Sequence, residues 1–415
     1  MRVLFYEIRK AFVSPVILSL LFLFIGFNSY LIYQNSYIKE DLQEANRIAN
    51  TYGTEINDKM LSSMKNDYEA QMEKVNEVTN RESRKTYLDM NEFYLDTHAN
   101  SYKPEELKLF SNTALLEFYY FSSLEIDESF QKMDPVDMAE FDIKMFGISG
   151  SAAEFIRDQY PKFNERYQEV QTNSEYKHLF PAQSIFGTHL LLFKTLFKSL
   201  LLESLILSVL ATAYIMNFEF DRGTYLLTYS TKRGRKLWVD KLLASLITSV
   251  VILTLILGIG LLSYFTIFSY KEFWHVPISS FFNAGKGWFM SWWNLSFLEY
   301  LAAAVGLAYL LIILFTLITV IISRWVHNSY LVFFLFIVLF GCIFASQGLT
   351  STSNVSFIFG YFTPVSLILN SFIWFMFRPV TITPYYESIT VVVWFIILLS
   401  ATVYCAKNFR KCDLK

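Results

Sequence analysis

Six apolar stretches, each long enough to cross a lipid bilayer, set the strongest limit on how this chain can fold. A transmembrane helix needs about 20 mainly apolar residues. The stretches cover residues 15–33, 189–216, 242–268, 298–322, 329–346 and 388–406. Hydrophobic side chains make up 53% of the 415 residues, more than a soluble domain of that size usually carries. The sequence therefore predicts an all-α integral membrane protein with six transmembrane helices.

Basic residues indicate which side of the membrane the loops face, because Lys and Arg near span ends are retained in the cytoplasm. They gather in the N-terminal residues 1–14, in the loop 217–241 and in the tail 407–415. An even number of crossings places all three clusters on one side. We therefore expect a multi-pass protein of the cell membrane whose N- and C-termini are both cytoplasmic.

A seventh apolar segment, residues 357–377, contains Pro364 and Asn370. Seven crossings would move the basic tail outside the cell, so we expect a re-entrant hairpin that dips in from the outer side before the last span. Irregular backbone is tolerated at membrane depth only where protein or water covers it. The alternative is a kinked true span here, with 329–346 failing to cross.

A long polar insertion, residues 34–188, separates the first two spans and lies outside the cell on this topology. It holds 16 Lys and Arg against 28 Asp and Glu, a net charge of −12, whereas the rest of the chain carries +10. It contains no cysteine, so packing rather than disulfides must stabilise it. Its length is sufficient for a core of its own.

The periodicity of this insertion favours helices. Apolar residues recur three to four positions apart from Leu42 to Met72, which is the α-helical period. Pro104 followed by two glutamates predicts a helix start. Another helix is expected from about residue 152 past residue 167, with a kink at Pro161. We expect a mostly helical extracellular domain.

Motifs for catalysis and metal binding are missing from the sequence. It has no GxxxxGK[ST] phosphate loop, and its five histidines form no HExxH pair. Gly147-Ile148-Ser149-Gly150 resembles the serine motif of intramembrane proteases, but it lies in the polar insertion, so we expect an ordinary turn. We therefore expect no enzyme activity, no metal site, no cofactor bound by this chain and no nucleic-acid binding.

Charged residues inside apolar stretches are costly and usually face the interior of a helix bundle. Lys198 and Glu203 lie in the second stretch; Glu203 is expected either to pair with Lys198 or to line a translocation path with it. The alternative for Lys198 and its neighbour Lys194 is that both extend to the lipid headgroups.

Two further patterns concern packing and the membrane surface. In the fourth stretch, small residues four positions apart allow close approach of another helix, either within the chain or from a second chain. They are Ala302 with Gly306 and Ala304 with Ala308. The outer loop 269–297 contains tryptophans that indicate an aromatic belt at the membrane surface. These are Trp274, Trp288, Trp292 and Trp293.

Two cytoplasmic segments have distinctive patterns. Within residues 1–14 the apolar side chains share one helical face and the basic ones lie opposite, which predicts a helix in the membrane interface before the chain turns at Pro15. The loop 217–241 combines basic residues with a short apolar segment, which favours a small docking helix. The alternatives are a plain amphipathic anchor and a basic loop that only sets the topology.

These two segments resemble the type-2 permeases of ATP-binding-cassette exporters. Residues 6–15 are similar to the interfacial helix of that family, and residues 219–241 are similar to the segment that follows its second span. The resemblance also includes the outer hairpin before the last span, but not the insertion 34–188. The residues that carry it are Glu7, Arg9 and Lys10 in the first segment and Glu219, Arg222, Gly223, Thr224, Arg235 and Lys241 in the second.

The resemblance implies a cytoplasmic ATPase subunit that contacts the segment 217–241 and itself binds ATP and Mg. It also implies that a second permease chain, identical or closely related, helps to enclose the path. Replacing Glu219, or Arg235 together with Lys241, is then expected to uncouple transport from ATP hydrolysis.

The expected cargo is an amphipathic peptide or antibiotic-like molecule moved out of the cell, because the acidic insertion would attract a cationic cargo. Export of a lipid, a drug or sodium fits the same plan. The competing hypothesis is a non-transporting membrane sensor or immunity protein whose extracellular domain binds a ligand.

Overall fold

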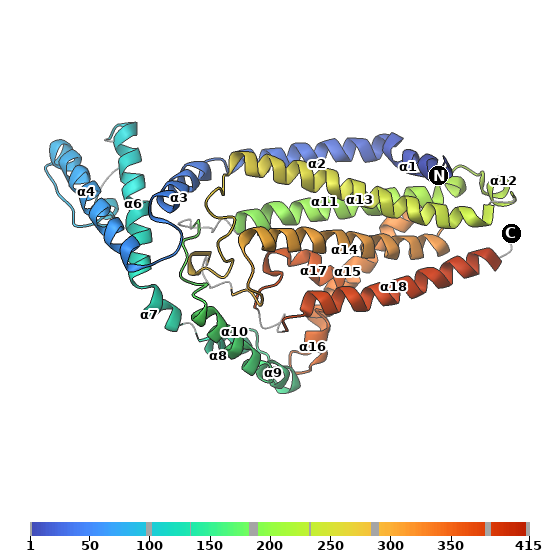
Figure 1. Ribbon diagram of the computed structural model, residues 1–415. Helices are drawn as coiled ribbons and strands as arrows, with labels where there is room; N and C mark the ends of the chain where they lie inside the picture. The colour runs from blue at the N-terminus through green and yellow to red at the C-terminus, as the bar shows by residue number, and fades with distance from the viewer. Residues whose placement is uncertain are drawn as a thin grey trace.

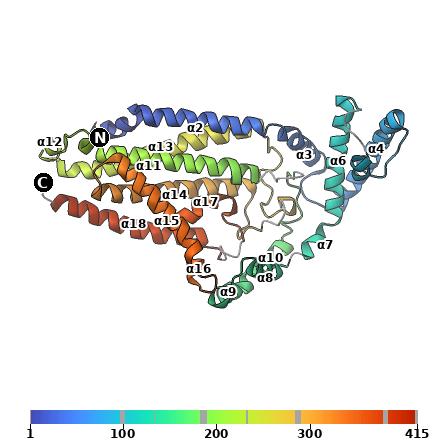
Figure 2. The ribbon, with the colours of Figure 1, turned by 180° about the vertical axis from the view of Figure 1, so that it is seen from behind.

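The described part of the protein is helical and elongated (Figure 1). The computed structural model describes residues 2–96, 102–132, 134–181, 190–231, 234–283, 290–377 and 383–411. Within these ranges, β-structure is limited to isolated bridges, such as the one between Glu55 and His178. A bundle of long helices carries both termini at one end, named here the terminal end, and a domain of shorter helices at the other, the domain end (Figures 1 and 2).

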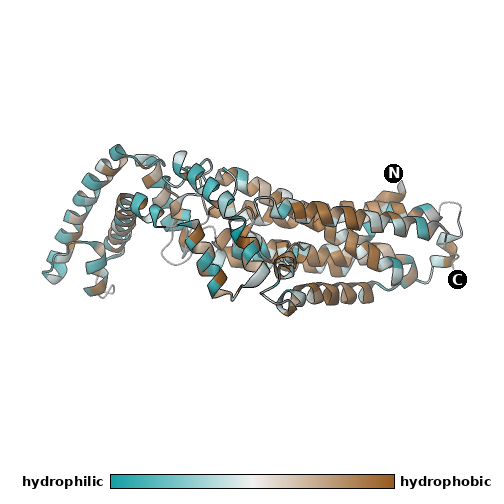
Figure 3. Ribbon diagram, turned by 90° about the horizontal axis from the view of Figure 1, so that it is seen from below, coloured by the Kyte–Doolittle hydropathy of each residue, from teal (hydrophilic) through white to brown (hydrophobic). Residues whose placement is uncertain are grey.

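Six helices in the described residues are long and apolar enough to cross a membrane. They are α2 (Pro15–Gln34), α11 (Phe197–Asp221) preceded by the π-helical turn η2 (Leu190–Leu196), α13 (Gly234–Ile267), α14 (Phe297–Trp325), α15 (Ser329–Leu349) and α18 (Tyr386–Lys411). They overlap the six apolar stretches of the sequence, and Figure 3 shows hydrophobic residues along the bundle and hydrophilic ones on the domain. The fold is that of an all-α, multi-pass membrane protein.

The second of these helices forms the centre of the bundle. In its most apolar part, α11 is 72% buried inside the structure, whereas α2 is 22% buried and α15 only 11%. A helix that is apolar on all sides must be covered by protein or by lipid. Protein therefore surrounds α11, whereas most of α2 and α15 is left for lipid or a second chain to cover.

Local hydrogen bonds explain where two of these helices begin. Ser296 and Glu299 cap α14 reciprocally, because the Ser296 N–H donates to the Glu299 carboxylate at 2.8 Å and the Glu299 N–H donates to the Ser296 hydroxyl at 3.3 Å. The side chain of Asn328 accepts from the Leu331 N–H at 3.0 Å and so starts α15. Glu299 is thus a capping residue at the domain end.

Between α15 and α18 the chain forms only short helical segments: α16 (Ser356–Phe359), α17 (Pro364–Leu369) and the 3₁₀ turn η4 (Ser371–Ile373). The segment 357–377 contains no helix of span length. Six helices of span length without this segment favour six crossings over the kinked-span alternative, and re-entrance itself stays a prediction.

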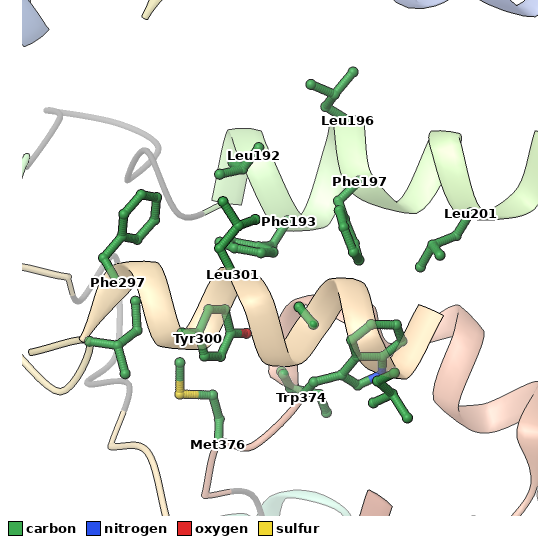
Figure 4. Close-up of a cluster of buried hydrophobic side chains, with 14 of the residues drawn as sticks. Leu192, Phe193, Leu196, Phe197, Leu201, Phe297, Tyr300, Leu301, Trp374 and Met376 are labelled. Atoms are coloured by element: carbon green, nitrogen blue, oxygen red, sulfur yellow. The ribbon is translucent and has the colours of Figure 1, made fainter. Parts of the chain in front are cut away.

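Aromatic packing holds this irregular segment against the bundle. The ring of Trp374 lies 5.8 Å from the ring of Phe197 in α11, and its indole N–H donates to the Leu367 carbonyl at 2.9 Å. The ring of Phe193 lies 4.9 Å from that of Tyr300 in α14. Figure 4 shows these rings in one buried cluster between α11, α14 and the segment that carries Trp374.

The domain between α2 and α11 consists of short and medium helices. They are α3 (Ile38–Tyr52), α4 (Asp58–Ser83), α5 (Met90–Asp96), α6 (Pro104–Leu124), α7 (Ile126–Gln131), α8 (Pro135–Met145), α9 (Gly150–Arg157) and α10 (Tyr160–Thr172). In Figure 1, α4 and α6 form an arm that points away from the bundle, and α8 to α10 return toward it. The prediction of a mostly helical domain is confirmed within the described residues.

Two helix boundaries in this domain differ from the sequence prediction. The apolar period that continues from Leu42 to Met72 is broken between α3 and α4, because Gly53 adopts a φ of +93° and Asn57 caps α4. The helix expected past residue 152 is divided into α9 and α10. Pro161 does not kink it but stands in the first turn of α10, where proline needs no hydrogen-bond partner.

Three remaining elements complete the chain. At the terminal end, α1 (Arg2–Val13) precedes α2, and α12 (Tyr225–Tyr229) lies between α11 and α13. At the domain end, the 3₁₀ turn η3 (Phe281–Asn283) lies between α13 and α14.

Candidate functional site

Four charged side chains form a largely buried cluster at the terminal end, in which Lys10 is partly exposed. The ammonium of Lys10 on α1 lies 2.7 Å from the carboxylate of Glu7 and 2.8 Å from that of Glu219 on α11. The other carboxylate oxygen of Glu219 pairs with the ammonium of Lys241 on α13. Lys241 is fully buried, and Glu7 and Glu219 are each 4% exposed. Two acids and two bases thus balance each other inside the protein.

The cluster fastens α1 to the helix pair α11 and α13. Glu7 and Lys10 are three positions apart and share one face of α1. Glu219 lies in the last turn of α11, where Lys241 also donates to the Met216 carbonyl at 3.1 Å. A cation near the carbonyl end of a helix is favourable for the helix dipole. The two lysines therefore bind the end of α11 from two neighbouring helices.

Burial makes these four charges depend on one another. Each buried ion loses several kcal/mol of hydration, which is offset only while its partners stay in place. One carboxylate oxygen of Glu7 has no hydrogen-bond partner in the structure. The ammonium of Lys10 also lies 4.3 Å above the ring of Phe218, a further attraction. A shift of α1 relative to α11 would unpair charges, so these helices must move together or break the cluster.

A tight turn follows the cluster. Gly223 has a φ of +68°, a conformation that glycine adopts without strain. The N–H of Thr224 then donates to the Glu219 carbonyl at 2.8 Å. The predicted Gly-Thr pair therefore shapes the start of α12, directly beside the buried charges.

α12 has one buried face and one exposed face. Tyr229 is 4% exposed and its ring lies 5.3 Å from that of Phe409 on α18; burial raises the pKa of the Tyr229 hydroxyl well above its ordinary value. Leu226 and Leu227 are 54% and 76% exposed. Because they lie outside the spans, these two leucines are a candidate contact surface for a partner protein. The short helix predicted in the loop 217–241 is present, and its docking role stays a prediction.

The remaining predicted coupling residues lie around this cluster. Arg9 is exposed, and the exposed Arg222 has its guanidinium 5.8 Å from the ring of Phe218. Arg235 lies in α13, and its side chain, like residues 232–233, falls outside the described part of the chain. The structure thus brings together Glu7, Lys10, Glu219 and Lys241, with Arg9 and Arg222 outside them.

A second buried carboxyl lies within the bundle. Glu203 on α11 is 6% exposed and accepts a hydrogen bond from the side-chain amide of Asn28 on α2. Among the described residues, no ion pair joins Glu203 to Lys198, which is half-buried. Sequence reasoning missed Asn28, although the signal was present: an amide in the middle of the first apolar stretch needs a partner in the bundle.

A cavity of about 380 Å³ lies at the terminal end between α2, α11 and α15. Asp221 and Arg222 supply charged lining, and the Ser329 hydroxyl at the start of α15 donates to the Asp221 carboxylate. Ile17 and Leu210 supply apolar lining. Small-molecule sites usually measure about 300–1,000 Å³. Its size and mixed lining suit an amphipathic molecule.

The residues predicted to shape the hairpin have local roles at the domain end. Pro364 occupies the first turn of α17, and Asn370 ends that helix, its amide donating to the Ser366 carbonyl at 3.0 Å. Most of α17 is buried by the bundle. Irregular backbone at membrane depth needs this kind of cover.

The turn from Gly147 to Gly150 joins the domain between α2 and α11, named here the inserted domain, to the bundle. The Ser149 N–H donates to the Thr352 carbonyl at 3.2 Å, and the Thr352 hydroxyl donates to the Gly147 carbonyl at 2.9 Å. A methyl group added to Gly150 would lie 2.6 Å from the Ser353 carbonyl oxygen. The segment expected to be an ordinary turn is therefore a docking point on the loop after α15.

The tryptophans of the loop 269–297 do not form the uniform surface belt that we expected. Trp292 is 7% exposed and its ring lies 5.2 Å from Phe163 on α10, because the inserted domain covers this part of the loop. Trp293 is 36% exposed, as a residue at the membrane surface would be. Trp288 lies outside the described residues.

The small residues of α14 divide between two faces. Ala304 and Ala308 are fully buried, so packing within the chain explains that pair. Ala302 and Gly306 are exposed, and no atom lies within 4 Å of a methyl group placed on Gly306. Only the second pair is available to another chain.

Comparisons with known proteins give no family for this chain. Among the residues that the structure describes, no three His, Cys, Asp or Glu side chains are grouped as metal ligands. No protein-family model, curated protein or solved structure matches the chain.

Proposed function

We propose that this chain is the permease subunit of an ATP-binding-cassette exporter, powered by a separate ATPase subunit that docks on the segment 217–241. The observation that carries the proposal is the buried charge cluster, which joins α1, α11 and α13 beside the exposed leucines of α12. An ATPase subunit bound to α12 would move three helix ends that ion pairs already join.

In this proposal the terminal end faces the cytosol. The basic segments 1–14, 217–241 and 407–415 flank the spans there, and basic residues near span ends favour the cytoplasmic side. The N-terminus, the C-terminal helix end and α12 all lie at this end of the bundle in Figure 1. The inserted domain is then extracellular, and the segment 357–377 is a re-entrant hairpin from the outer side.

The proposed mechanism uses the cluster as a mechanical link. ATP and Mg bound by the partner bring two ATPase subunits together, and α12 follows with α1, α11 and α13. The permease bundle then changes from an arrangement open at the terminal end to one open at the domain end. The partner must bind the two arrangements with different affinity, because contact alone shifts no equilibrium. A second permease chain, identical or closely related, completes the path.

The cavity between α2, α11 and α15 supports an amphipathic cargo. Asp221 and Arg222 suit the charged part of such a molecule and Leu210 its apolar part. The inserted domain, with its net charge of −12, favours a cationic peptide or antibiotic-like molecule by long-range attraction.

The partner is tested by purifying the chain with the ATPase that accompanies it and measuring ATP hydrolysis. Replacing Leu226 and Leu227 together by alanine should remove the ATPase from the complex. The matched control replaces Leu88 and Leu95, two leucines of the inserted domain that are 88% and 81% exposed. Co-purification of a kinase or of no ATPase would instead favour the sensor hypothesis, and equal ATPase binding by both double variants would overturn the docking site.

The cargo is tested in proteoliposomes that contain the permease with its ATPase. A cationic amphipathic peptide should stimulate hydrolysis in the parent, and Leu210→Trp, which fills the cavity, should abolish the stimulation. Leu262→Trp is the control, because Leu262 is 69% exposed on α13 and away from the cavity. Stimulation by phospholipid or sodium in place of the peptide would replace the cargo assignment but keep the permease.

A further inference from the structure

Three exposed apolar side chains stand at the end of α8. Phe141, Met145 and Phe146 are 64%, 57% and 56% exposed. Ala139 and Ile143 of the same helix are buried, so the inner face of α8 already has its packing partners within the domain. Phe141 and Met145 are four positions apart and share one helical face. α8 is therefore apolar on two sides, and only one of them is covered by protein.

The position of this helix relative to the bundle is fixed by hydrogen bonds. The turn that follows α8 contacts the loop that follows α15, through the Ser149 N–H and the Thr352 carbonyl at 3.2 Å and the Thr352 hydroxyl and the Gly147 carbonyl at 2.9 Å. α15 ends at Leu349, close in sequence to Thr352. In a chain whose α15 spans the membrane, Leu349 lies at the membrane boundary of the domain end. The C-terminal end of α8 then lies near that boundary.

The exposed apolar surface of the bundle continues toward α8. Leu349 at the end of α15 is 84% exposed and Phe359 on α16 is 54% exposed. The ring of Phe359 lies 5.7 Å from that of Phe155 on α9, and the views in Figures 1 and 2 agree in placing α9 beside α16. The exposed apolar surface of α15 thus extends over α16 toward the α8–α9 segment.

We propose that the C-terminal half of α8 lies in the lipid interface at the domain end, with Phe141, Met145 and Phe146 inserted among lipid headgroups and upper acyl chains. The exposed Lys144 stands between these residues, and its long side chain can reach the headgroups. The exposed acidic Asp137 lies toward the other end of the helix, and Asp142, between Phe141 and Ile143, is only partly exposed.

This anchor attaches the inserted domain to lipid, in addition to its contacts with the loop after α15 and with the loop 269–297. Interfacial helices bury their apolar face by about 5–10 Å into the boundary between headgroups and acyl chains. The arm of α4 and α6 is then the part of the domain that remains free of the membrane. The inference requires only that the long helices span the bilayer, so it stands apart from the proposed exporter function.

Site-directed spin labelling of the full chain in phosphatidylcholine–phosphatidylglycerol vesicles tests the proposal. Single cysteines replace Phe141, Met145 or Phe146 in a chain whose Cys342, Cys405 and Cys412 are replaced by alanine. The controls are Leu88→Cys and Leu95→Cys, which place the same label on equally apolar, exposed sites of the inserted domain. Collision of each label with oxygen, which dissolves in lipid, is compared with collision with a water-soluble nickel chelate.

The three α8 labels should collide more with oxygen than with the nickel chelate, and the two controls should show the reverse order. Labels on α8 that behave like the controls would show that the helix is in water and would overturn the proposal. Labels that are shielded from both reagents would also overturn it, because a second protein copy or another part of the chain would then cover the helix.

Discussion

Two buried charge clusters, one at each end of the molecule, are built in different ways. At the domain end, Arg166 on α10 pairs with Glu175 through two hydrogen bonds and donates a third to the Ser291 carbonyl at 2.9 Å. Arg166 is 4% exposed and Glu175 2%. At the terminal end, Lys10 and Lys241 share Glu219, and the cluster joins three helices.

The two clusters differ in how far apart in sequence their partners lie and in whether every charged atom has a hydrogen-bond partner. Arg166 and Glu175 are nine positions apart, and a planar guanidinium fixes a carboxylate in one geometry. Lys10 and Glu219 are 209 positions apart, a lysine is a point charge without that fork, and one oxygen of Glu7 has no partner. We infer that the Arg166 cluster is a local corner of the fold, whereas the Glu219 cluster is a junction that makes three helices move together.

The largest effect is expected at the junction. Glu219→Gln leaves Lys241, which is fully buried, without its carboxylate, and should lower the free energy of unfolding by about 4–5 kcal/mol. Adding Lys241→Met should recover much of the loss, because both charges are then gone. Denaturant unfolding of the purified protein in detergent measures both. A single variant as stable as the parent would contradict the pairing.

A slightly smaller effect is expected at the corner. Arg166→Met leaves Glu175 buried, but the amide of Asn173 still donates to it, so the loss should be about 3 kcal/mol. The damage should be local, because Arg166 holds α10 to the Ser291 carbonyl. Protease cleavage should therefore increase in the inserted domain and not in α12. Equal increases of cleavage in the inserted domain and in α12 would contradict a local role for the Arg166 cluster.

The docking turn offers a matched pair of glycines. Gly150→Ala and Gly147→Ala both place a side chain at positive φ, which costs about 1–2 kcal/mol each. The methyl group at Gly150 would also contact the Ser353 carbonyl, whereas no atom lies within 4 Å of a methyl group placed on Gly147. Gly150→Ala should therefore detach the turn from the loop, whereas Gly147→Ala should not. The exchange rate of the Ser149 N–H measures this detachment. Identical exchange in the two variants would argue against close docking.

The smallest effect concerns pH. Arg157 and Tyr160 each hydrogen-bond Glu140 at 2.8 Å and lower the pKa of its carboxyl to about 2. An unfolded Glu has a pKa of about 4.3, so this contribution is present above that value and is lost as the pH falls toward 2. Its size should stay below about 1 kcal/mol because the pair is near the surface. The acid loss of stability should be smaller in Glu140→Gln than in the parent; equal losses would contradict the shift.

The sequence predicts the helices of the bundle better than their contacts. The spans follow from apolar length, and α1 follows from the helical period of residues 1–14, because both signals are local. The break at Gly53 was missed, since the apolar spacing of α3 continues into α4. The contact of Lys10 with Glu219 and that of Asn28 with Glu203 join helices distant in sequence, so no local pattern specifies them.

The proposed function requires the two ends of the bundle to face opposite sides of the membrane, with the junction inside the cell. A membrane-impermeant thiol reagent tests this in intact cells, using Leu227→Cys on α12 and Leu88→Cys on the inserted domain in a chain without other cysteines. Both positions are exposed, at 76% and 88%. Labelling of Leu88→Cys in intact cells, and of Leu227→Cys only after the membrane is opened, is the predicted result; labelling of Leu227→Cys in intact cells would contradict it.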